Sequence, residues 1–250
     1  MPDARQTISI AFWTYVIPMT ATRAMRVGLL LFGLFLLCVV CLFFGGVFVS
    51  DIVNDALLGM RHFLVMAGLP VGAVLLSEMP IRDGITHRTL LYPLLGPVPR
   101  TTLAAVRVLV TSATLAIGAG LALLLIRALL KEGLGFLPRE LLAVSLGALA
   151  YVPLFGLVHL YNRRGLITNL SILFLFDIPL GRVPFSLRNI SPSYHIGVIA
   201  DQQDVLRLPV SLGLPPTSVT MSVIVLLSIA VVFGTALVFG FKRKNLGELC

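Results

Sequence analysis

Six long apolar segments constrain this chain more than any other feature of its sequence. A helix needs about 20 predominantly apolar residues to cross about 30 Å of hydrocarbon. The chain is 58% hydrophobic and only 12% charged, whereas a soluble domain of 250 residues would need far more polar surface. The composition and the segments predict an all-α, polytopic membrane protein. The six expected transmembrane helices are residues 27–49, 57–77, 103–126, 141–160, 166–180 and 217–241.

A shorter apolar segment, residues 4–24, precedes the first span. Apolar residues recur in it at helical spacing: Ile8, Phe12, Tyr15 and Met19. With arginines on both flanks, this pattern is typical of an amphipathic helix lying on a membrane surface. We expect Pro18 to bend or interrupt that helix. No small-x-small cleavage site follows the first apolar run, so we expect that run to be retained as a span.

Basic residues are distributed unequally between the two sides of the expected membrane. With the amino terminus placed inside, twelve of the 19 lysines and arginines fall in inside segments. Because basic residues near span ends favour the cytoplasmic side, we expect both termini in the cytoplasm, at a bacterial plasma (inner) membrane. Arg139 and Glu140 are expected to border an outer loop. The net charge of +8 then reflects topology and contact with bilayer headgroups, and nucleic-acid binding is not expected.

Cysteine usage indicates neither a disulfide framework nor a clear metal site. Two of the three cysteines, Cys38 and Cys41, lie in the first span, and Cys250 is the last residue. Cys38 and Cys41 share a helical face. Two soft thiol ligands can bind copper(I), but packing as small apolar side chains is the simpler interpretation. We expect no metal or other cofactor bound by this chain.

The polar stretch between the second and third spans, residues 78–102, is the most informative part of the sequence. In order it contains Glu78, then Asp83-Gly84-Ile85-Thr86, then Pro97-Val98-Pro99-Arg100, with Arg107 seven residues further on. This order resembles the cytoplasmic loop of ABC-2-type transporter permeases. Those proteins show an acidic residue ending the second span, an acidic residue with Gly-Thr, then Pro-x-Ser-Arg and a lysine. Here Pro99 stands in place of the serine and Arg107 in place of the lysine.

The resemblance implies a cytoplasmic coupling helix that docks into a separate ATPase. Gly84 would permit a tight turn, and Thr86 would cap the short helix that follows. Charged side chains would pair with charges on the ATPase. The residues expected to couple are Glu78, Arg82, Asp83, Gly84, Thr86, Arg88 and Arg100. The alternative is a solvated loop whose charges only determine topology.

The sequence lacks Gly-x-x-x-x-Gly-Lys-Ser/Thr, the motif that cradles nucleotide phosphates. We therefore expect a transport subunit that is not itself an enzyme. The resemblance implies an exporter assembled from two permease subunits, identical or not, and two ATP-binding cassette ATPase subunits that bind ATP and Mg²⁺. Motifs of intramembrane proteases are also absent. The alternative function is that of a secondary transporter or a non-catalytic membrane scaffold.

The connection between the fifth and sixth spans, residues 181–216, faces outward in this topology. Its apolar content predicts short membrane-dipping helices, with a plain structured loop as the alternative. Within it, Ser191-Pro192-Ser193-Tyr194-His195 is similar to a short motif of the same permease family. The resemblance thus extends, more weakly, over the whole chain.

Two ionisable residues of the spans are candidates for a transport pathway. Asp177 lies within the fifth span, and carboxylates in membranes are costly and often functional. It also lies near the outer end, where it would mark the end of a helix or pair with Arg182. His159 lies near the inner end of the fourth span, where an interfacial histidine is the simpler interpretation.

Overall fold

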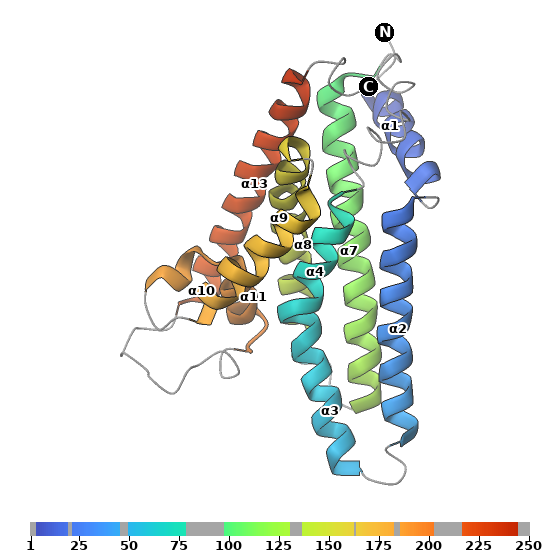
Figure 1. Ribbon diagram of the computed structural model, residues 1–250, viewed down its shortest axis with the longest axis vertical. Coiled ribbons are helices and arrows are strands. Elements are labelled where there is room, and N and C mark those ends of the chain that lie inside the picture. Colours follow the sequence, from blue (N-terminus) through green and yellow to red (C-terminus); the bar gives the residue numbers. More distant parts are fainter. Residues whose placement is uncertain are drawn as a thin grey trace.

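The computed structural model describes residues 4–19, 22–45, 50–78, 98–130, 137–162, 164–182, 186–202 and 217–244 (Figure 1). In chain order the elements are α1 (Ala4–Met19), α2 (Arg23–Gly45), α3 (Ser50–Phe63), η1 (Leu64–Gly68), α4 (Leu69–Leu76), α7 (Arg100–Leu130), α8 (Leu137–Tyr161), α9 (Gly165–Ser171), η4 (Ile172–Asp177), α10 (Ile178–Arg182), η5 (Ser186–Ile190), α11 (Pro192–Ile199) and α13 (Val219–Arg243). All elements in these residues are helical, as the sequence predicts.

Five continuous helices are long and apolar enough to cross a membrane. They are Val53–Leu76, Arg100–Leu130, Leu137–Tyr161, Gly165–Arg182 and Val219–Arg243. These helices coincide with the second to sixth expected spans and confirm, by length and composition, an all-α polytopic membrane protein. The first expected span falls on α2, whose described apolar part, Met25–Cys41, is shorter. The second span also begins earlier than expected, because α3 starts at Ser50 and includes Asn54 and Asp55.

Two of the spans contain a π-helical turn, and a proline follows each turn at the same distance. Pro70 follows η1, which ends at Gly68, and Pro179 follows η4, which ends at Asp177. Proline has no N–H to donate within a helix, and its ring clashes with the preceding turn. A π-helical turn changes the hydrogen-bond register locally and so relieves this conflict. In the fifth span the shifted register ends on Asp177.

Helix α8 is the centre of the bundle. It packs against α4, α7, α11 and α13, and most of its length is buried. Small residues allow the neighbours to come close: a Cβ added at Gly147 would lie 2.7 Å from side-chain atoms of both Leu69 and Ile196. At Gly156 an added Cβ would lie 3.1 Å from Leu237. Glycine at helix contacts is typical of membrane bundles, where close backbone approach increases van der Waals contact.

Helix α1 packs against α7 near one end of the bundle (Figure 1). The Tyr15 hydroxyl lies 2.7 Å from the Thr111 hydroxyl, and the Arg107 guanidinium lies over the Tyr15 ring, 5.0 Å from its centroid. The apolar face that the sequence predicts for this helix is not buried as a whole, because Tyr15 is buried whereas Ile8 and Phe12 are exposed. Both sides of α1 therefore carry apolar residues. The helix also continues through Pro18 to Met19.

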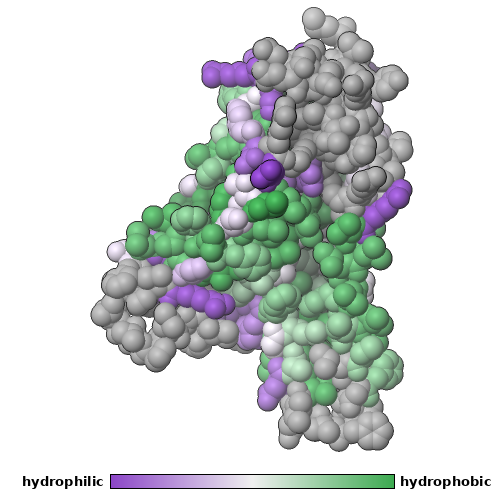
Figure 2. All heavy atoms as spheres, in the orientation of Figure 1, coloured by the Kyte–Doolittle hydropathy of each residue, from purple (hydrophilic) through white to green (hydrophobic). Residues whose placement is uncertain are grey.

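The ends of the helices define the two ends of the bundle. Helix α13 ends and α7 begins at the same end of the molecule, where α1 also lies, and α2 starts below α1 and runs away from that end (Figure 1). Helix α2 ends, α3 begins and α7 ends toward the other end (Figure 1), and the Arg127–Glu140 ion pair brings the start of α8 to the end of α7. Hydrophobic residues cover most of the described surface on the face shown, and hydrophilic residues lie mainly toward its upper and lower margins (Figure 2).

Candidate functional site

The carboxylate of Asp177 is the centre of a buried polar cluster between α8, η4 and α11. The Tyr151 hydroxyl donates to Oδ2 of Asp177, and the Ser191 hydroxyl donates to Oδ1 at 2.6 Å. The Ser193 backbone N–H points at Oδ1 from 3.3 Å. Asp177 is only 7% exposed, so these donors take the place of water around the carboxylate. The structure therefore pairs Asp177 with Tyr151, Ser191 and Ser193 rather than with Arg182.

This cluster holds the beginning of α11. Ser191 is the N-cap residue of α11, with its side chain 3.4 Å from the Tyr194 N–H, and Pro192 occupies the first turn. An acidic group near a helix N-terminus is favourable because the unpaired N–H groups there carry partial positive charge. Gly181 is required for the close approach, since an added Cβ would lie 2.8 Å from Oγ of Ser193. All eight residues of α11 are buried.

A second set of polar contacts joins α11 to α13. The Nε2 of His195 lies 2.8 Å from the Asn189 carbonyl oxygen, and its Nδ1 lies 3.0 Å from the Ser222 hydroxyl. Because a carbonyl can only accept, Nε2 carries the proton and Nδ1 accepts from Ser222. The Tyr194 hydroxyl contacts the Thr217 hydroxyl at 3.0 Å. The sequence singled out this Ser-Pro-Ser-Tyr-His stretch, but its partners on other helices were not predictable from it.

We expect His195 to make folding stability depend on pH. Burial lowers the pKa of His195 below 6.5, and the hydrogen bond to Asn189 opposes that shift. The folded state therefore favours the neutral ring, and its stabilising contribution is complete above about pH 6.5 and is lost as pH falls through the lowered pKa. Thermal unfolding of the wild type should shift downward between about pH 7 and pH 5. In His195→Gln, which keeps an N–H toward Asn189, the shift should be smaller. An identical pH dependence in the two proteins would contradict this.

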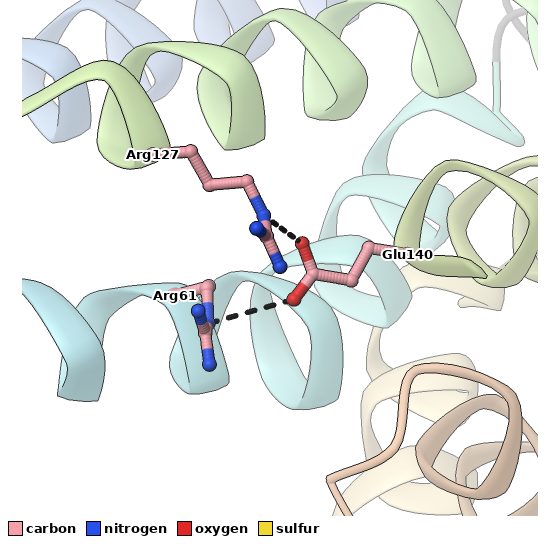
Figure 3. A network of polar contacts seen from close by, with 3 residues as sticks. All are labelled: Arg61, Arg127 and Glu140. Carbon is pink, nitrogen blue, oxygen red and sulfur yellow. Dashed lines mark hydrogen bonds and ion pairs between the residues drawn. The ribbon is translucent and has the colours of Figure 1, made fainter. Parts of the chain in front are cut away.

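A buried ion-pair network lies where the last turns of α3 and α7 meet the first turn of α8. Glu140 of α8 is held between two guanidinium groups (Figure 3). Its Oε2 lies 2.8 Å from Nε of Arg127 on α7, and its Oε1 lies 3.5 Å from Nε of Arg61 on α3. The side chains of Glu140 and Arg127 are 2% and 4% exposed and that of Arg61 is 15% exposed. We call these three residues the Arg-Glu-Arg clasp, because they join α3, α7 and α8.

The sequence did not predict the Arg-Glu-Arg clasp. Glu140 was expected at the border of a loop, but α7 extends to Leu130 and α8 begins at Leu137, so both Arg127 and Glu140 lie in helices. The available signal was the scarcity of charge: two arginines and one glutamate near span ends can enter a membrane protein interior only as a group. Arg139, one residue earlier, instead forms an exposed, 3.9 Å pair with Asp201.

His159 is not grouped with Asp177. It is buried between α4, α8 and the start of α9, with Nε2 3.3 Å from the Val74 carbonyl oxygen. A Cβ added at Gly165 would come within 2.3 Å of its ring, so the backbone of Gly165 packs directly against this histidine. Twelve residues of helix separate Gly165 from Asp177, a rise of about 18 Å. His159, on the fourth span, therefore lies beside the start of the fifth span, whereas Asp177 lies near the end of the fifth span.

Of the expected coupling residues, the structure describes Glu78 and Arg100. Glu78 follows α4 and Arg100 begins α7, and both are half-buried. Arg82, Asp83, Gly84, Thr86 and Arg88 lie outside the described residues. Cys38 and Cys41 are exposed on α2, and among the described residues there is no group of three or more side chains suited to hold a metal ion.

The fold and these clusters define an all-helical membrane protein with polar networks at its helix contacts. No known protein family, curated protein or solved structure matches this chain.

Proposed function

We propose that this chain is the membrane-spanning permease subunit of an ATP-driven ABC-2-type exporter. The ordered combination of residues from Glu78 to Arg107 carries the proposal. It places an acidic residue, an Asp-Gly-x-Thr segment, a Pro-x-x-Arg segment and a basic residue in the order and spacing of a coupling loop. In this proposal six spans cross a bacterial inner membrane and both termini are cytoplasmic.

The arrangement of the bundle supports the proposal in one respect. Helix α7 begins at the end of the bundle where α1 lies and α13 ends (Figure 1). The last turn of α13 and the residue after it are basic: Lys242, Arg243 and Lys244. Because basic span ends favour the cytoplasm, a coupling loop that leads into α7 would face the compartment that contains ATP.

Arg107 gives further support. It is the last residue of the ordered combination, it is buried in α7, and it stacks over Tyr15 of α1. The coupling loop would thus lead into a helix that is attached to the amino-terminal helix. Movement of the loop by an ATPase would be transmitted to α1 and α7 together, since a cation–π contact and the Tyr15–Thr111 hydrogen bond join them.

The proposal includes partners that this chain needs. A second permease subunit and two ATP-binding cassette subunits would complete the transporter, and ATP and Mg²⁺ would bind to the ATPase subunits. The charged side chains of the coupling loop would contact the ATPase, where opposite charges on the partner provide specificity.

Co-purification tests the proposal. The tagged full-length chain, expressed in its native host, should retain an ATPase that contains a phosphate-binding Gly-x-x-x-x-Gly-Lys-Ser/Thr loop. Asp83→Lys or Arg88→Glu should reduce the retained ATPase and its stimulated ATP hydrolysis by roughly tenfold or more, as expected when an interface charge meets a like charge.

Arg139→Glu is the matched control. It also reverses a charge, but Arg139 is exposed and lies near the start of α8, outside the coupling loop. The control variant should retain the ATPase fully. A wild-type chain that retains no such ATPase, or coupling-loop variants that behave like Arg139→Glu, would refute the proposal and favour a secondary transporter or a scaffold.

A further inference from the structure

A cavity of about 390 Å³ lies between α2, the η1–α4 segment and α7. This volume is in the range of small-molecule sites in proteins. Along α2 the cavity is lined from Met25 to Phe35, a rise of about 15 Å. The lining of the cavity is therefore elongated along α2. We call it the α2–α4–α7 slot.

The walls of the slot are apolar. Among the described residues that line it, Thr114 is the one with a polar side chain, and its hydroxyl already donates to the Val110 carbonyl at 2.9 Å. A buried water needs two to four polar partners, so water would be poorly held here. An empty cavity of this size would deprive its lining of van der Waals contacts. The slot is therefore suited to a flexible, apolar occupant.

Exposed apolar side chains border the slot. Leu29 and Leu31 of α2 and Phe63 of α3 line it and are also among the exposed large side chains. On a helix that lies in a membrane, exposed apolar side chains contact lipid tails. A tail can therefore enter the slot from the side without passing through water.

The charge at one end of the slot indicates which apolar molecule fits. Met25 is the first residue of α2 in the lining. The next residue in the chain, Arg26, is exposed. A guanidinium recognises a phosphate through two parallel hydrogen bonds. An elongated apolar space with an exposed arginine beside one end matches a phosphate head group that carries a long hydrocarbon chain.

We propose that the α2–α4–α7 slot binds one acyl chain of a membrane phospholipid, with the phosphate near Arg26. The chain would fill the gap between α2 and the α4–α7 pair and would serve as part of the packing of α2. The site is independent of the ATPase partner, because it needs only the bundle and a bilayer.

Photolabelling of the full-length chain in phosphatidylcholine vesicles tests the site. The probe is a phosphatidylcholine with a diazirine at the middle of one acyl chain. Label should concentrate on residues that line the slot, such as Phe32 and Leu75.

At Gly118, which lines the slot, an added Cβ has no heavy atom within 4 Å, so a larger side chain enters open space. Gly118→Leu should lower slot labelling by roughly tenfold, because the occupant would be overpacked, and Gly118→Ala should lower it less.

Gly234→Leu is the matched control. Gly234 of α13 also has no heavy atom within 4 Å of an added Cβ, but it does not line the slot, so slot labelling should be unchanged. The proposal would be overturned if labelling were spread evenly over exposed α13 residues such as Val231 and were the same in the wild type, Gly118→Ala and Gly118→Leu.

A diacylglycerol with the same diazirine chain should label less. Equal labelling by it, or no loss of phosphatidylcholine labelling in Arg26→Gln, would overturn the assignment of a phospholipid.

Discussion

Replacing Glu140 by glutamine is expected to lower the thermal stability of the protein more than any other single charge change in the described residues. Glutamine preserves the size of the side chain but removes the only negative charge in the Arg-Glu-Arg clasp. Arg127 and Arg61 would then remain in the interior as two positive charges without Glu140 as their counter-charge. Breaking a buried ion pair by removing one partner costs about 3 kcal/mol or more. For a chain of this length that corresponds to a fall in Tm of about 6–12 °C.

The control for Glu140→Gln is Asp201→Asn. Asp201 also pairs with an arginine, but both side chains are 56% exposed and the separation is 3.9 Å. Exposed pairs of this kind contribute little because water and salt screen them. Asn also tolerates the positive φ of 58° at this position. Thermal unfolding of the three proteins in one detergent measures the difference. If Glu140→Gln and Asp201→Asn lowered Tm equally, the clasp would have no special role in joining α3, α7 and α8.

The second large effect is expected at Asp177. Replacing it by alanine removes the acceptor of the Tyr151 hydroxyl and of the Ser193 N–H, while the backbone carbonyl of residue 177 still accepts from Ser191. A hydrogen bond to a charged group contributes about 2 kcal/mol, which corresponds to roughly a thirtyfold change in an opening equilibrium. Amide hydrogen exchange in α11 should therefore accelerate by roughly that factor, because α11 would be held less firmly.

Two further variants make this measurement specific. Asp177→Asn keeps one carbonyl oxygen as an acceptor, so exchange in α11 should accelerate less than in Asp177→Ala. Ser228→Ala removes an exposed hydroxyl that donates within α13 to the Ile224 carbonyl, and it should leave α11 unchanged. Uniform acceleration over all helices in Asp177→Ala would indicate general destabilisation and contradict a local role for the cluster.

The two clusters have different relations to the sequence. Asp177 was recognisable as a candidate because an ionisable residue within an apolar span is rare and costly. Its partners were not recognisable: Tyr151 precedes it by 26 positions, and Ser191 follows it by 14. For Glu140 the sequence predicts the border of a loop, because charge is typical of the ends of spans. The helices extend past those charges, since Glu140 is neutralised by arginines from neighbouring helices.

The amino-acid sequence by itself predicted a polytopic membrane protein and approximately where five of its spans lie. Hydrocarbon excludes polar groups, so long apolar segments need no partner information to be recognised. Only the tertiary structure decided which polar side chains meet. Those meetings depend on the rotation and register of each helix, and π-helical turns before Pro70 and Pro179 shift that register locally. The Arg-Glu-Arg clasp, the Asp177 cluster and the α2–α4–α7 slot all arise from contacts between separate helices, which no single helix encodes.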